Sequence, residues 1–228
     1  MNFLNKLEKK YRKYAIPNLM YYIVMLYGAG LVIQLFAPMA YWRFLSLDIG
    51  ALMHGQIWRL VTFIIYPPTM GTFVFDSVFF GIISLFLYYS LGVTLERVWG
   101  AFRFNVFFLM GMVGEILAAL VSYFVFHQNL YVTTGFLNFS LFLAFAICFP
   151  DVQFYLFMVI PVKAKWMAIA ESAVYVYSFL VGSASTRCEI VLSLANVILF
   201  FLMTRNYSRI NPKEIHRKKQ FKQQTKIR

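Results

Sequence analysis

Long apolar runs, separated by short polar or charged breaks, are the feature that most constrains the fold of this chain. An α-helix needs about 20 mostly apolar residues to cross a hydrocarbon core of about 30 Å. The pattern predicts an all-α membrane protein with six transmembrane helices. The six expected spans are Asn18–Ala37, Thr72–Leu95, Phe104–Phe126, Val132–Phe149, Trp166–Val181 and Glu189–Thr204.

Composition excludes the other broad protein classes. The 228 residues are 61% hydrophobic and 13% charged, whereas a soluble domain averages roughly 45–50% apolar and about 25% charged residues. Disorder is excluded as well, because it needs low hydrophobicity and high charge density. Cys148 and Cys188 lie in or beside apolar runs and offer neither a disulfide framework nor a metal-ligand spacing. No metal or cofactor is expected.

The positions of the basic residues predict which way the helices point. All 21 Lys and Arg residues except Arg43, Arg59 and Arg187 lie before the first span, after the second or fourth span, or in the C-terminal tail. Under the positive-inside rule this asymmetry makes both ends of a six-span chain cytoplasmic. The chain then divides into a basic segment (1–17), a membrane domain (18–204) and a basic tail (205–228).

The net charge of +12 would suggest nucleic acid in a soluble protein. Here it indicates membrane topology, and no nucleic-acid partner is expected. The tail is basic enough to attract anionic lipid headgroups. A solvated tail that only fixes the topology is the simpler interpretation.

Two segments outside the spans have irregular patterns. Residues 38–71 are too long for a simple turn and mix aromatic residues with polar and charged ones. We expect an amphipathic element in the outer interface there, with Trp42 and Trp58 at headgroup depth. Residues 152–165 hold an apolar stretch that is too short to span, and we expect it to lie along the inner interface.

Two short motifs flank the second span. The first runs from Gly55 through Trp58 and Arg59 to Thr62, and the second comprises Gly92, Glu96, Gly100 and Arg103 followed by Phe104. In order and position they resemble motifs of the rhomboid superfamily, and the resemblance covers roughly residues 15–205. It implies a rhomboid-like six-helix bundle with a long interfacial first outer loop. The stretch 160–166 is similar to bacterial rhomboid-like proteins, which implies a multi-pass protein of a bacterial inner membrane.

Physical chemistry gives these motif residues architectural roles. Glu96 and Arg103 flank a short cytoplasmic turn, where they can pair with each other or with freed backbone groups. Gly100 allows a tight turn. The guanidinium of Arg59, beside Trp58, can donate to loop carbonyls from a fixed fork.

The chemistry of active rhomboids is missing from this chain. The resemblance implies a Gly-x-Ser-Gly stretch opening the fourth helix and a His on the sixth, but residues 133–136 read Thr-Thr-Gly-Phe. Either Thr134 or Gly135 occupies the nucleophile position, and Ser140 lies too deep in the helix. The sixth span holds no histidine; the histidines of the chain are His54, His127 and His216. The chain is therefore interpreted as a pseudoprotease, with a Thr134–His127 pair as the remote alternative.

Acidic residues within or near the spans form a second set of candidates, because ionised groups are costly there and often functional. Asp76, Glu115 and Glu171 either form a proton or ion path or face the bundle interior in hydrogen-bonded or protonated form. The second interpretation is favoured, since no inverted repeat or broken-helix pair indicates a transporter. Gly111 and Gly114 provide a small-residue face for helix packing within the chain.

Three functional hypotheses follow. The leading one is a non-catalytic rhomboid-fold protein that binds transmembrane helices of client proteins, admitted between the second and fifth helices as the resemblance implies. Local thinning of the bilayer by short helices favours client helices with polar residues. The alternatives are an intramembrane serine-type endopeptidase with a non-standard dyad, and a small transporter that uses Glu115 and Glu171.

Overall fold

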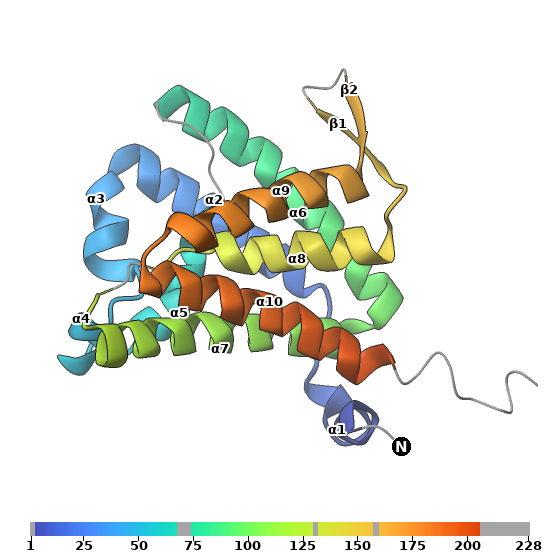
Figure 1. Ribbon diagram of the computed structural model, residues 1–228, viewed down its shortest axis with the longest axis horizontal. Helices are drawn as coiled ribbons and strands as arrows, with labels where there is room; N and C mark the ends of the chain where they lie inside the picture. The colour runs from blue at the N-terminus through green and yellow to red at the C-terminus, as the bar shows by residue number, and fades with distance from the viewer. Residues whose placement is uncertain (1–2, 68–73, 130–131, 157–159, 206–228) are drawn as a thin grey trace, which may run out of the picture.

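The structure, a computed structural model, describes residues 3–67, 74–129, 132–156 and 160–205, and these are mostly helical (Figure 1). The elements in chain order are α1 (Phe3–Tyr11), η1 (Arg12–Tyr14), α2 (Leu19–Phe36), α3 (Pro38–Ala40), η2 (Tyr41–Leu45), α4 (Ile49–Met53), α5 (Arg59–Thr62), η3 (Phe63–Ile65), α6 (Val74–Trp99), α7 (Ala101–Phe126), α8 (Gly135–Cys148), β1 (Gln153–Leu156), β2 (Ile160–Lys163), α9 (Ala164–Val181) and α10 (Ala184–Arg205).

Four helices of the described chain are long and apolar enough to cross a membrane: Leu19–Phe36, Phe79–Trp99, Ala101–Phe126 and Ala184–Met203. This is compatible with an all-α membrane protein. The other two expected spans also form helices, but α8 has only 14 residues and α9 carries Lys165 and Glu171 within its 18 residues. Helices α7 and α10 begin at Ala101 and Ala184, several residues before the expected spans at Phe104 and Glu189.

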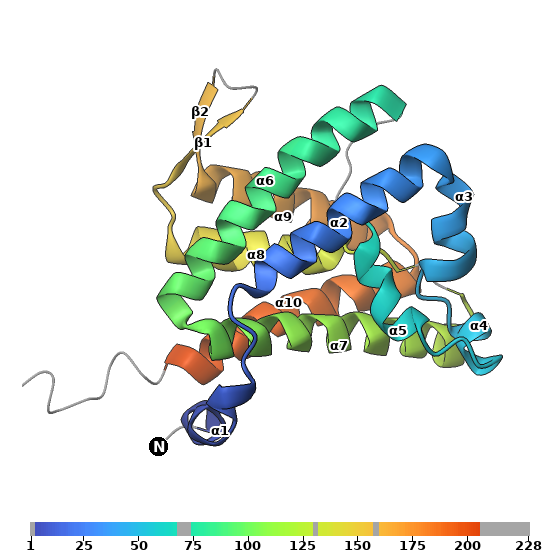
Figure 2. The ribbon, with the colours of Figure 1, turned by 180° about the vertical axis from the view of Figure 1, so that it is seen from behind.

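The long helices form a bundle in which α7 and α10 lie side by side and antiparallel, with α8 and α9 over them (Figures 1 and 2). The short helix α8 is central, because it packs against α6, α7, α9 and α10, while α2 packs against α6. The loop helices α3, α4 and α5 gather at one end of the bundle. The α6–α7 turn, α1 and the β1–β2 hairpin gather at the other end (Figure 1).

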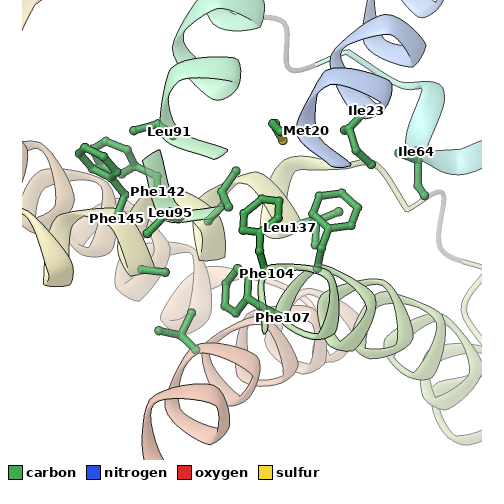
Figure 3. Close-up of a cluster of buried hydrophobic side chains, with 14 of the residues drawn as sticks. Met20, Ile23, Ile64, Leu91, Leu95, Phe104, Phe107, Leu137, Phe142 and Phe145 are labelled. Atoms are coloured by element: carbon green, nitrogen blue, oxygen red, sulfur yellow. The ribbon is translucent and has the colours of Figure 1, made fainter. Parts of the chain in front are cut away.

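The core is an apolar cluster to which α2, α6, α7 and α8 contribute most of the buried side chains, with further ones from α9, α10 and the loop helices. Figure 3 shows Leu91 and Leu95 of α6 beside Phe142 and Phe145 of α8, with Phe104 and Phe107 of α7 below Met20. Gly92 permits the close contact between α2 and α6, since a Cβ there would lie 2.7 Å from Cβ of Met20.

The segment expected to lie along the inner interface forms a hairpin, and its position relative to the membrane stays a prediction. Strands β1 and β2 pair antiparallel, with Gln153 opposite Lys163. Asp151 precedes the hairpin and lies 3.4 Å from the Nζ atoms of both Lys163 and Lys165. The hydrogen bond from Lys163 and the charge of Lys165 lower the pKa of the exposed Asp151 carboxyl group below its usual 3.8. Pairing of the two strands therefore gives hydrogen-bond partners to backbone N–H and C=O groups that a single extended segment would leave without partners.

The N-terminal segment is more than a basic extension. Helix α1 packs against α7 and α10, its Leu4 is buried, and Glu8 forms an ion pair with Arg103 of α7 at 2.9 Å. The prediction of a separate cytoplasmic segment missed this contact. Residues 206–228 lie outside the described residues, so the lipid-binding role of the basic tail stays a prediction, and His216 lies there too.

Candidate functional site

The first motif fixes the loop between α2 and α6, as expected. Arg59 is only 3% exposed, and its guanidinium donates to the carbonyls of Ser46 at 2.7 Å and of Arg43, while its Nε donates to Oε1 of Gln56 at 2.7 Å. The indole of Trp58 donates to the carbonyl of Phe44 at 3.1 Å. The expectation that Arg59 holds loop carbonyls is confirmed.

Two further loop residues support this arrangement. Gly55 has φ +91°, a conformation that glycine adopts without strain. The hydroxyl of Tyr41 donates to the carbonyl of Phe63 at 3.1 Å, and burial raises the pKa of Tyr41 above its usual value, which keeps the donor proton in place. Residues 38–67 thus form a string of short helices, and their placement in the outer interface stays a prediction.

The second motif closes the turn between α6 and α7. Gly100 has φ +84° and caps α7, as the expected tight turn requires. Glu96 does not pair with Arg103, however. Its Oε1 accepts the backbone N–H of Asn18 at 2.7 Å, while Arg103 binds Glu8. Of the two alternatives for Glu96, pairing with a freed backbone group is therefore the one found.

Residues at the expected nucleophile position have structural partners. Thr134 is fully buried, its hydroxyl donates to the carbonyl of Tyr66 at 2.8 Å, and it accepts from the side-chain amide of Asn138 at 3.1 Å. Gly135 is exposed at the start of α8, and the deeper Ser140 donates to the carbonyl of Leu137 at 2.7 Å. His127 is exposed at the end of α7. The hydroxyl proton of Thr134 is thus already donated in a hydrogen bond to a backbone carbonyl.

The acidic candidates fall into different environments. Glu115 of α7 is 4% exposed; it accepts from the backbone N–H of Leu137 in the first turn of α8 and lies within electrostatic range of Glu189. Glu171 of α9 is only partly buried. Asp76 falls within α6, but its side chain lies outside the described residues. The structure thus brings Glu115 near Glu189, a residue that the sequence reasoning did not select.

Tyrosines connect these acids into one polar group. Tyr175 lies within electrostatic range of Glu171, Glu115 and Glu189, and Tyr88 within range of Glu171 and of the phenols of Tyr27 and Tyr175. Tyr27 donates to Oδ1 of Asn138 at 3.0 Å. We call the set the central polar cluster, and it draws on α2, α6, α7, α8, α9 and α10. Its members are Tyr27, Tyr88, Glu115, Thr134, Asn138, Glu171, Tyr175 and Glu189.

Sequence reasoning missed five of the eight cluster members, namely Asn138, Glu189 and the three tyrosines. Tyr27, Tyr88 and Tyr175 lie in apolar runs, where an aromatic ring counts as hydrophobic although its hydroxyl needs a partner when buried. Glu189 was placed at the first residue of a span, whereas α10 begins at Ala184 and encloses it. The available signal was Ser183, a residue type common at the N-cap of a helix, whose hydroxyl oxygen accepts from the backbone N–H of Thr186.

Polar residues also line the contact between α7 and α10. Asn105 of α7 and Asn196 of α10 are buried, and the side-chain oxygen of each lacks a hydrogen-bond partner among the described residues. A Cβ at Gly111 would lie 3.0 Å from Nδ2 of Asn196. The expected small-residue face therefore packs within the chain, with Gly111 toward Asn196.

The described residues contain no group of three or more His, Cys, Asp or Glu side chains that could hold a metal ion. Comparisons with protein-family models, with curated proteins and with solved structures find no match to this chain. The central polar cluster can accept hydrogen bonds and bind cationic groups through its carboxyl groups, and its hydroxyl groups can donate.

Proposed function

We propose that this chain is a six-span rhomboid-like pseudoprotease that binds transmembrane segments of client proteins. The six spans are α2, α6, α7, α8, α9 and α10. The observation that carries the client-binding role is the arrangement of α6 and α9: each packs against α8, but they share at most marginal contact with each other. A client helix placed between them would not have to break an existing helix pair.

The short central helix favours such binding. At about 1.5 Å per residue, the 14 residues of α8 extend roughly 21 Å, less than a hydrocarbon core of about 30 Å. A bilayer thins locally around a short span, and a client helix with polar residues is accommodated at lower cost in the thinner region.

The partners of Thr134 support the absence of proteolysis. A nucleophilic hydroxyl needs a base within hydrogen-bond reach, but this hydroxyl donates to the carbonyl of Tyr66. The described helix α10 contains no histidine. Purified protein should therefore show no labelling by a serine-reactive fluorophosphonate probe and no cleavage of helical substrates. Cleavage that persists in the native chain but disappears in Thr134→Val would instead identify an endopeptidase.

The proposed membrane topology follows from the positions of the basic residues. The end of α6 with Arg97, the start of α7 with Arg103, and the hairpin and start of α9 with Lys163 and Lys165 lie at the same end of the bundle as α1, opposite the α3–α5 loop (Figure 1). We assign that end to the cytoplasm by the positive-inside rule, with the chain in the cell membrane. Labelling from outside of a cysteine introduced at position 210, with Cys148 and Cys188 replaced by Ala, would contradict this topology.

Photocrosslinking tests client binding directly. Val174 lies three residues from Glu171, on the same side of α9, and Val176 lies roughly 140° around the helix from Glu171. The two side chains are 63% and 59% exposed, so they form a matched pair. With p-benzoylphenylalanine at position 174, a transmembrane peptide in the same nanodisc should crosslink strongly, and at position 176 weakly. Equal yields at the two positions would contradict docking between α6 and α9.

A further inference from the structure

Three carboxyl groups within the bundle have no basic partner among the residues that the structure describes. Among the described residues, ion pairs join Glu8 to Arg103 and Asp151 to Lys163 and Lys165, all at one end of the bundle. Glu115, Glu171 and Glu189 have no such partner in that part of the chain. The interior of the bundle thus carries acidic groups without compensating positive charge.

Only one of the three is accessible to a partner. Glu115 and Glu189 are 4% and 7% exposed on α7 and α10, two helices that pack closely along their length. Glu171 is partly exposed, and no hydrogen bond to its carboxyl group is found among the described residues. It lies on α9, which packs against α8 and α10.

The surroundings of Glu171 place it beside the gap between α6 and α9. Tyr88 of α6 lies within electrostatic range of the Glu171 carboxyl group, although α6 and α9 share at most marginal contact. Tyr175, one turn along α9, stacks on Phe139 of α8 with ring centroids 4.0 Å apart. The carboxyl group is therefore flanked by two phenols at the position where the proposed client helix would lie.

Charge complementarity identifies the client. An ionised carboxylate is costly at this depth in a membrane, and so is a Lys or Arg within a single transmembrane helix. Pairing the two offsets both costs. We propose that Glu171 recognises client transmembrane helices through a Lys or Arg side chain near the middle of the client span. This inference rests on the proposed client-binding function and adds the chemical class of the client.

The test compares two host peptides of Leu and Ala that differ only at the central residue, Lys or Leu. Binding is measured by titration in nanodiscs, with crosslinking at position 174 as the readout of location. We expect the Lys peptide to bind about tenfold more tightly, in line with polar contacts of roughly 1–2 kcal/mol between helices in membranes. Glu171→Gln should remove this preference. Glu115→Gln changes a buried carboxyl group that a client helix cannot reach, so it should keep the preference.

Each outcome decides the question. Equal affinities for the two peptides, with crosslinking at position 174 intact, would overturn the role of Glu171 and leave the proposed function standing. Absence of binding by either peptide would overturn the proposed function itself. A Lys preference that survives in Glu171→Gln would assign recognition to another residue. Self-association that Glu171→Gln abolishes, without a Lys preference, would make a second copy of the chain the occupant and overturn the inference.

A second measurement uses the native chain alone, in case Glu171→Gln fails to fold. The Lys is moved along the host peptide one helical turn at a time. Affinity should peak where the depth of the Lys matches that of Glu171. A flat profile would overturn the proposal.

Discussion

Replacing Arg59 by Ala should be among the most destabilising single changes in this protein. The guanidinium is 3% exposed and donates to the backbone carbonyls of Arg43 and Ser46 and to the side chain of Gln56. Hydrogen bonds from a charged donor contribute roughly 1.5–3 kcal/mol each and are not additive. Because the change leaves two loop carbonyls without their donor, we expect a loss of about 3–5 kcal/mol in the free energy of unfolding.

Arg187 provides a matched control. It also donates to two backbone carbonyls, those of Phe179 at 2.9 Å and Leu180 at 3.1 Å, but from an exposed position. Arg187→Ala should cost only about 0.5 kcal/mol, as is usual for surface positions. Arg59→Lys should lie between the two, because a single ammonium cannot reproduce the guanidinium fork.

The assay is reversible unfolding of the purified protein in mixed micelles by titration with a denaturing detergent, followed by circular dichroism. Similar losses for Arg59→Ala and Arg187→Ala would refute the argument, because they would show that burial of the donor does not determine its contribution. A full loss in Arg59→Lys would be consistent with the fork geometry, whereas no loss would show that charge alone suffices.

Three other predictions follow from the packing, the capping contact and the ion pair. Gly92→Ala should lower the unfolding free energy by about 1–3 kcal/mol, because the added Cβ overlaps Met20 in a packed contact. Gly28→Ala should leave the unfolding free energy nearly unchanged, because nothing lies within 4 Å of its added Cβ. The same detergent titration compares the two variants. Glu96→Ala should lower folded yield, measured by size-exclusion chromatography, and Glu96→Gln should restore most of it, because an amide oxygen still accepts from the backbone of α2; equal yields for the two variants would contradict this. The lowered pKa of Asp151 means that its ion pair stabilises the hairpin above pH 3.8 and that this contribution is lost as the pH falls through the lowered folded-state pKa. Hydrogen exchange of the hairpin amides should therefore be unchanged from pH 5 to 8 after correction for the intrinsic rate and should speed up in acid, a step that Asp151→Asn should abolish.

The sequence predicted those features that depend on local pattern. Apolar runs located every long helix, because burial of about 20 apolar residues in a membrane is a property of the run itself. The positive φ of Gly100 and the ability of Arg59 to hold loop carbonyls also followed from the chemistry of single motif residues. In these cases the residues that interact are close in sequence, as for Arg59 and Ser46, which are 13 positions apart.

Contacts between distant segments could not be predicted in the same way. Glu8 and Arg103 are separated by 95 positions, and the pattern near Arg103 offers the closer Glu96 as an apparent partner. The hairpin was missed because its strands read as one apolar stretch, and backbone pairing decided the structure there. In the central polar cluster, Tyr88 and Glu171 come together only through the packing of α6 and α9 around α8.

The contact between Asn18 and Glu96 also sets an order of events during synthesis. The backbone N–H of Asn18, the N-cap residue of α2, receives its acceptor from a residue 78 positions later in the chain. At about 5–20 residues per second, a ribosome takes roughly 4–16 s to produce that acceptor after Asn18 has been made. During this interval α2 can be inserted but not capped by Glu96, and the α6–α7 turn has not yet formed. The earliest stage at which the nascent chain can complete the α2–α6 pair is therefore the emergence of Glu96 from the ribosome.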